Sequence, residues 1–208
     1  MQNDQITSLK DERIQLAKRL STLKGRLHGK KILIEGLAAI NWAIQSKVEI
    51  DYILVSKKSN IVLKNNSSVK TFLISDGLLK KVTGTKYLIP EVAVAYIKNN
   101  TKDSDFVVVL DDIQDFGNLG TIVRTCHAFG IDTLISTTYE MDLYQRKTVN
   151  ASRGNVFSTN LKKFKNPIEV IKFLRKNNFH IVTTSPRGTD MQSMVTFSGK
   201  PIALVVGN

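Results

Sequence analysis

The segment from Phe106 to Gly130, FVVVLDDIQDFGNLGTIVRTCHAFG, constrains the fold of this chain more than any other. Its first five residues are apolar and predict a buried strand, which two aspartates and a loop closing on Gly-Asn-Leu-Gly follow. Apolar residues then recur at helical spacing until Gly130, which stands where a helix-capping glycine belongs. The order strand, polar loop, helix places polar groups at the carboxyl end of a strand, where open α/β sheets bind ligands.

Arg124 lies off the apolar stripe of this predicted helix, about one turn into it. A cation there opposes the positive end of the helix dipole, so we expect it to have an anionic partner. That partner is either a ligand or one of the three aspartates between strand and helix, as in an ordinary surface ion pair. This segment by itself leaves both interpretations open.

The rest of the chain continues the alternation of strands and helices. The first half predicts strands at residues 31–34, 50–55, 71–74 and 92–97, and helices over 6–24, 37–44 and 76–83. The second half predicts strands at 106–110, 133–136, 156–160, 179–183 and 202–206, and helices over 119–129, 142–150 and 167–176. Such alternation predicts an α/β fold with a mostly parallel sheet covered on both faces. The polar stretch 98–105 is the predicted domain boundary.

The net charge of the chain favours one class of function. Thirty Lys and Arg oppose eighteen Asp and Glu, a net charge of +12 that is typical of nucleic-acid binders. Two segments concentrate this charge: residues 10–31, and residues 143–165, which contain no acid. Solvated helix faces are the alternative interpretation of both segments.

Several classes of protein are not expected. Cys126 is the single cysteine, so no intramolecular disulfide can form, and a reducing, cytoplasmic setting fits. The polar N-terminus lacks the apolar core of a secretory signal, and no stretch reaches the ~20 apolar residues of a membrane span. The three histidines are isolated, so no metal site is predicted. Neither the dinucleotide fingerprint nor a Walker motif occurs.

Two motifs resemble a known family. VVVLDDIQDFGNLGTIVRTCHAFG resembles the first motif of the SpoU, or TrmH-type, branch of the SPOUT RNA 2′-O-methyltransferases, and Asn118, Gly120 and Arg124 occupy its Asn-x-Gly-x-x-x-Arg core. NASRGNVFS, with Arg153, looks like the segment after the second strand, in the form closest to the thiostrepton-resistance ribosomal RNA methyltransferases. KILIEGLAAINWAIQSKVEIDYILVS is similar to the small domain, of the L30e ribosomal protein type, that precedes the catalytic domain in this family.

The resemblance implies the architecture. It predicts a basic helical extension over residues 1–25, an L30e-like RNA-binding α/β domain over 26–104, and a SPOUT, or α/β-knot, domain over 105–208. ALVVGN at 203–208 looks like the start of the second family motif, which normally continues Gly-Asn-Glu-x-x-Gly. The chain therefore predicts a catalytic domain that is truncated before the knot closes, as in a fragment of a longer gene product.

The resemblance also implies the chemistry, which is methyl transfer from S-adenosylmethionine to a ribose 2′-hydroxyl, with ribosomal RNA favoured over transfer RNA and a homodimer as the usual assembly. Arg124 and Asn118 match the catalytic positions. Because a guanidinium stays protonated, we expect Arg124 to bind a phosphate and orient the hydroxyl rather than act as a general base. The remaining site residues are Gly207, Asn208 and Thr184 for the cofactor, and Arg153, Arg146, Lys147 and Arg26 for RNA.

Alternatives stay open for the residues and for the whole chain. Asn118 can be a turn residue, and Arg153 can be a plain surface charge. The chain can also be an RNA-binding remnant of the family that no longer transfers methyl groups. A small-molecule α/β enzyme without RNA is the third hypothesis, which the charge disfavours.

Overall fold

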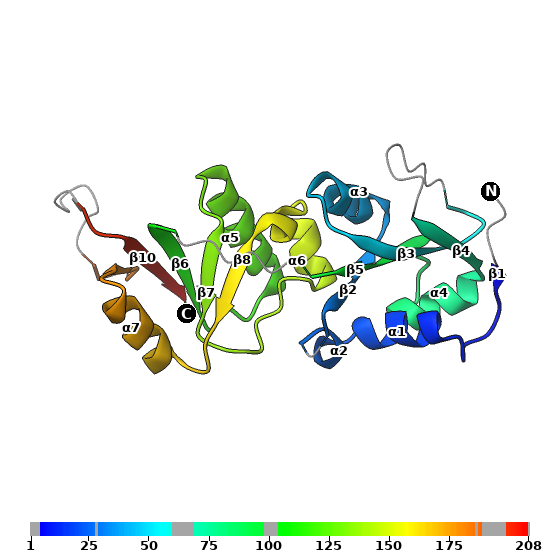
Figure 1. Cartoon of the computed structure of the whole chain (residues 1–208), viewed down its shortest axis with the longest axis horizontal. Helices are drawn as coiled ribbons and strands as arrows, with labels where there is room; N and C mark the ends of the chain where they lie inside the picture. Colours follow the sequence, from blue (N-terminus) through cyan, green and yellow to red (C-terminus); the bar gives the residue numbers. More distant parts are fainter. Residues whose placement is uncertain are drawn as a thin grey trace.

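A computed structural model describes residues 5–27, 29–59, 69–97, 104–185, 187–188 and 199–207. These residues form two five-stranded sheets, which lie side by side along the long axis of the molecule (Figure 1). The first sheet has the order β1-β4-β3-β5-β2, with strands β1 (Gln5–Ile6), β2 (Lys31–Glu35), β3 (Ile50–Val55), β4 (Lys70–Ile74) and β5 (Glu91–Tyr96). The second has the order β8-β7-β6-β10-β9, with strands β6 (Phe106–Asp111), β7 (Thr133–Ser136), β8 (Asn160–Lys163), β9 (His180–Thr183) and β10 (Ile202–Gly207).

Helices cover both sheets. The first sheet is accompanied by α1 (Glu12–Leu20), α2 (Leu23–Leu27), α3 (Leu37–Gln45) and α4 (Asp76–Thr83). The second is accompanied by α5 (Phe116–Ala128), α6 (Arg146–Ala151), the 3-10 helix η1 (Asn155–Ser158) and α7 (Pro167–Lys176). The predicted capping residues begin and end these helices: Ser75 accepts the N–H of Leu78 at 3.3 Å, and Asn166 accepts the N–H of Glu169 at 3.0 Å.

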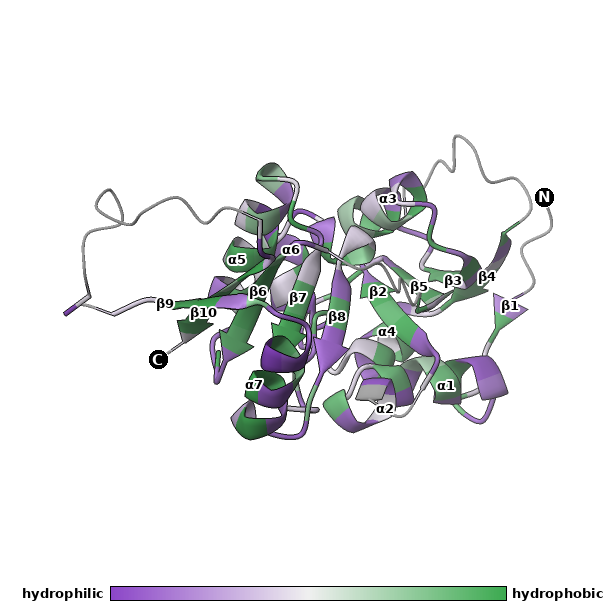
Figure 2. Ribbon diagram, turned by 60° about the vertical axis from the view of Figure 1, so that its left-hand side comes forward, coloured by the Kyte–Doolittle hydropathy of each residue, from purple (hydrophilic) through white to green (hydrophobic). Residues whose placement is uncertain are grey.

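The second sheet is parallel throughout, as predicted. Val108 and Leu110 point to the face where α5 packs, and Val107 and Val109 point to the face where α7 packs. Strands buried on both faces read as continuous apolar runs, and Figure 2 shows this hydrophobic colouring along β6, β7 and β10. The first sheet is mixed, because β5 runs antiparallel to both of its neighbours, β2 and β3.

Several predicted boundaries were wrong. The helix predicted over residues 6–24 is divided into strand β1 and two shorter helices, α1 and α2, and the helix predicted over 142–150 begins only at Arg146. The strand predicted at 156–160 is η1 followed by a later strand, β8. Val156 and Phe157 are buried as the sequence suggested, but a short apolar run cannot by itself distinguish a strand from a helical turn. Helix α5 begins at Phe116, three residues before the predicted start, because the Asp115 side chain caps it there.

From residue 5 onward, the segment predicted as an N-terminal extension forms part of the first sheet and of the helices that pack on it. Strand β1 pairs in parallel with β4, and Ile14, Ala17 and Leu20 of α1 are buried in the same apolar cluster as Leu79. The division into an extension and two domains stays a prediction, as does the interruption of the knot. Most of the predicted boundary segment, 98–105, lies outside the described residues.

The two sheets share one apolar core. A single cluster of buried residues contains Ile40 from α3 beside the first sheet and Leu119 and Phe157 beside the second. Trp42 of α3 packs against Gly154, where an added Cβ would lie 2.3 Å from the Cβ of Trp42 and where φ is +80°. The residue at position 154 must therefore be glycine, because the left-handed backbone and the indole both exclude a side chain.

Candidate active site at the carboxyl edge of the second sheet

Asp115 organises the loop between β6 and α5. Its Oδ1 accepts the N–H of Asn118 at 2.8 Å, and its Oδ2 accepts a hydrogen bond from Lys147 Nζ at 2.6 Å. The bond from Lys147, and then those from backbone N–H groups, hold the pKa of Asp115 below its usual value. The carboxylate therefore fixes the start of α5 and ties it to α6.

Arg124 lies exposed on α5 and makes no ion pair within the described part of the chain. Two of the aspartates that could have paired with Arg124 have other partners. Asp115 binds Lys147, and Asp112 accepts a hydrogen bond from the side chain of Gln114. Of the two interpretations of Arg124, the structure disfavours the ordinary surface ion pair. A free guanidinium on the exposed face of α5 is instead available to an anionic ligand.

Gly120 allows α5 and α6 to pack in close contact. A Cβ at this position would lie 2.6 Å from the Cβ of Ala151 and 2.7 Å from the carbonyl oxygen of Thr148. The hydroxyl of Thr148 also donates to the carbonyl oxygen of Phe116 at 3.2 Å. The glycine of the Asn-x-Gly-x-x-x-Arg core thus has a packing role, and it sets the position of the helix that carries Arg124.

The proposed cofactor residues follow two strands at the same edge. Gly207 ends β10 beside Asp111 of β6, and a Cβ on Gly207 would lie 2.6 Å from the carbonyl oxygen of Asp111. Thr184 follows β9, and both its N–H and its hydroxyl lie 3.3 Å from the carbonyl oxygen of Val205. Gly207 and Thr184 are exposed, whereas Asn208 lies outside the described residues. The small residues at the ends of β9 and β10 suit a ligand that packs against the backbone.

The four residues predicted to contact RNA have different surroundings. Arg153 is exposed at the end of α6, in a left-handed conformation with φ of 53°. Lys147 is 59% exposed, although its ammonium pairs with Asp115. Arg146 donates to Glu35 at 3.0 Å, across the two sheets.

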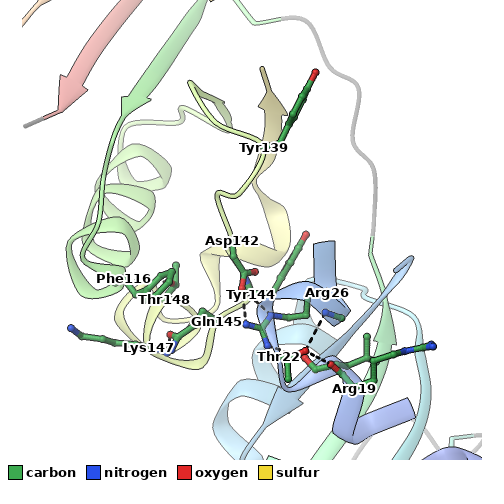
Figure 3. A network of polar contacts seen from close by, with 12 residues as sticks. Arg19, Thr22, Arg26, Phe116, Tyr139, Asp142, Tyr144, Gln145, Lys147 and Thr148 are labelled. Carbon is green, nitrogen blue, oxygen red and sulfur yellow. Dashed lines mark hydrogen bonds and ion pairs between the residues drawn. The ribbon is translucent and has the colours of Figure 1, made fainter. Parts of the chain in front are cut away.

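Arg26 is the exception, because it is buried. Its guanidinium pairs with Asp142 at 2.7 Å and donates to the carbonyl oxygen of Leu20 at 2.8 Å (Figure 3). The structure therefore places Arg26 between α2 and the loop after β7, which contradicts its expected position on an open surface. Asp142 lies directly before the basic segment 143–165, with Glu140 two residues earlier, and the sequence alone does not indicate which acid pairs with Arg26.

Glu35 is a partly buried acid at this junction. Burial raises the pKa of Glu35, and the nearby cations Arg146 and Arg26 only partly oppose that effect. The two sheets are therefore joined by charged pairs as well as by the apolar core. Sequence analysis did not identify Glu35, because its partner lies 111 positions away.

The described ranges contain neither a membrane-spanning helix nor a candidate metal site. No helix there has the length and apolarity that a membrane crossing requires. No group of three or more His, Cys, Asp or Glu side chains within those ranges could hold a metal ion.

Comparison with known proteins gives two family matches. Residues 105–208 match the SpoU rRNA Methylase family, and residues 11–91 match the MRM3-like substrate binding domain. The chain is 29% identical over 154 residues to the 23S rRNA (guanosine(2553)-2′-O)-methyltransferase RlmP of Bacillus subtilis (strain 168), a match that covers 74% of this chain and 62% of that protein.

Solved structures show the same fold. An RNA 2′-O ribose methyltransferase of 25% identity superposes with a TM-score of 0.73, over 98% of this chain and 81% of that one. The SpoU methyltransferase AviRb from Streptomyces viridochromogenes, solved with AdoMet, superposes with a TM-score of 0.77 at 23% identity, over 96% of this chain and 82% of that one.

Proposed function

The chain belongs to the SpoU rRNA Methylase family, and on that premise we propose that it transfers a methyl group from S-adenosylmethionine to a ribose 2′-hydroxyl of ribosomal RNA. The observation that carries the proposal is the exposed guanidinium of Arg124, which has no ion-pair partner in the described residues and belongs to the helix that follows the loop at the carboxyl edge. The relatives named above are rRNA or RNA 2′-O-methyltransferases, which supports the choice of reaction.

The carboxyl edge of the second sheet fits the cofactor. Gly207 and Thr184 would hold it, together with Asn208, since the described ends of β9 and β10 expose backbone and a small hydroxyl. The cofactor supplies an activated methyl group on a sulfonium. The chain's own contribution is to place the 2′-hydroxyl in line with that methyl group, and alignment of this kind can contribute about 7–11 kcal/mol in the best cases.

Arg124 performs the positioning. Its permanently charged guanidinium binds the phosphate of the target nucleotide and so orients the adjacent ribose. Asn118 lies at the third position of the same helix, exposed, with its backbone N–H held by Asp115. Its amide side chain is therefore free to contact the same nucleotide.

The cations that remain exposed guide the RNA. Arg153 and Lys147 are the proposed phosphate contacts near the site. Arg146 instead pairs with Glu35, a contact that joins the two sheets. Phosphate contacts release counterions, so affinity for RNA should fall steeply as salt is raised. Assembly as a homodimer and a cytoplasmic setting stay predictions.

The test compares Arg124→Ala with Arg175→Ala, which removes an equally exposed arginine from α7 on the other face of the sheet. We expect Arg124→Ala to abolish methyl transfer from radiolabelled S-adenosylmethionine to ribosomal RNA, while cofactor binding in calorimetry is unchanged. Arg175→Ala should transfer methyl groups like the wild type. Undiminished transfer by Arg124→Ala would refute the assigned role.

The alternative function is RNA binding without methyl transfer. Calorimetry separates it from the proposal, because the wild-type chain would then bind RNA but show no heat on titration with S-adenosylmethionine.

A further inference from the structure

The loop that follows β7 is held in one conformation by its own side chains. The hydroxyl of Ser136 donates to the carbonyl oxygen of Thr138 at 2.8 Å and accepts the N–H of Thr138 at 3.1 Å. The hydroxyl of Thr138 accepts the N–H of Glu140 at 3.2 Å. Two residues later, the buried Asp142 anchors the loop to Arg26. A loop fixed in this way at both ends can present a side chain without an entropic cost on binding.

The side chain that this loop presents is Tyr139. It is 56% exposed, and Figure 3 shows its ring directed away from Asp142 and Arg26. More than half of this large aromatic residue is left exposed, and Tyr139 belongs to none of the apolar clusters of the described residues. Its position at the carboxyl end of β7 puts it on the same edge as Gly207.

A lysine contacts the backbone of this tyrosine. Lys163 ends β8, and its Nζ donates to the carbonyl oxygen of Tyr139 at 3.3 Å. Burial lowers the pKa of Lys163, because desolvation outweighs the attraction of Asp142. Asp142 is already paired with Arg26, and no ion pair of Lys163 occurs among the described residues. A partly desolvated ammonium in this situation gains from an anionic ligand.

We infer that Tyr139 and Lys163 form a subsite for a nucleotide that flanks the methylated one, in which the tyrosine ring stacks on an unpaired base and the lysine binds the neighbouring phosphate. An aromatic face beside a cation is the combination that binds single-stranded RNA without base preference. β8 is two strands from β6, about 10 Å at the usual strand spacing, so the subsite lies beside the target nucleotide rather than at it.

This inference rests on the proposed function, since it requires RNA at the carboxyl edge. The probe is a short, unstructured RNA carrying a fluorescent label, with affinity measured by anisotropy. We expect Tyr139→Ala to weaken binding by about 5- to 150-fold, the range for loss of one base stack. Tyr139→Phe should bind like the wild type, because stacking needs the ring and not the hydroxyl.

Lys163→Gln tests the phosphate contact separately. Loss of one contact on single-stranded RNA should reduce the slope of log affinity against log salt by about 0.7. Tyr139→Ala should weaken binding and leave that slope unchanged. The control is Phe129→Ala, which removes a ring that is 78% exposed at the opposite end of α5 and should not change affinity.

A direct measure of stacking uses Tyr139→Trp. Addition of RNA should quench its fluorescence more than that of the wild type, whose single tryptophan is the partly buried Trp42. If Tyr139→Ala and Phe129→Ala both bind RNA like the wild type, or the new tryptophan is not quenched, the subsite is refuted. Failure of the wild-type chain to bind RNA or S-adenosylmethionine would instead refute the proposed function.

Discussion

The buried pair of Arg26 and Asp142 allows the contact between the two sheets to be tested by one change of charge. Asp142→Asn removes the negative charge from a side chain that is 3% exposed, facing a guanidinium that is 9% exposed. The substitution is nearly isosteric. An asparagine can still accept the N–H of Tyr144, which Asp142 Oδ1 accepts at 3.0 Å, so the loop keeps this hydrogen bond. Its amide nitrogen then replaces Oδ2, which accepts from Arg26 Nε at 2.9 Å, so the change removes both the charge and the acceptor that face Arg26.

The expected cost follows from the surroundings of Arg26. Removal of one partner from a buried ion pair costs about 3–5 kcal/mol, because the other charge stays desolvated. Arg26 keeps one further acceptor, the carbonyl oxygen of Leu20 at 2.8 Å, so we expect the lower end, about 3 kcal/mol. For a chain of this size, that corresponds to a fall in Tm of about 6–12 °C.

The assay is thermal and urea unfolding followed by circular dichroism. Lys58→Gln is the control, because it breaks the exposed pair with Asp76, in which Lys58 is 71% exposed, and should cost under about 1 kcal/mol. The double substitution Arg26→Met with Asp142→Asn removes both charges of this pair and should recover most of the loss. If Asp142→Asn costs no more than Lys58→Gln, or the double variant is less stable than the single one, the reasoning is wrong.

Two further predictions concern the helix and the acid at the junction. Gly120→Ala should destabilise the fold by about 1–3 kcal/mol in urea unfolding, because its Cβ would overlap the Cβ of Ala151 and the carbonyl oxygen of Thr148. Adding Ala151→Gly to this variant should restore only part of the lost stability. An unchanged stability of Gly120→Ala would contradict the close packing of α5 and α6. Burial raises the pKa of the Glu35 carboxyl above 4.5, so the folded state binds the carboxyl proton more tightly than the unfolded chain does. The free energy of unfolding should therefore fall as pH rises from 4.5 to the pKa of Glu35 in the folded state. Glu35→Gln should remove this component of the Tm–pH curve, and an unchanged curve would show that Glu35 does not titrate in this way.

Local chemistry made most elements predictable. The strand at 106–110, the caps at Ser75 and Asn166, and the exposed position of Arg124 on its helix all follow from residues within a few positions of one another. The early start of α5 was also encoded locally, in Asp115, but the glycine and asparagine that follow resemble a loop more than a first helical turn. The packing role of Gly120 could not be predicted, since its neighbours belong to another helix.

By itself, the amino-acid sequence determined the α/β class, most of the order of strands and helices, and the motif that contains Asn118 and Arg124, because periodicity and capping depend on near neighbours. Which cations are available to RNA was decided only by the tertiary structure. Arg26 is neutralised by an acid 116 positions away, whereas Arg124 has no such partner within the described residues. The physical reason is that an ion pair depends on distance in space, which the chain establishes only once the two sheets have packed together.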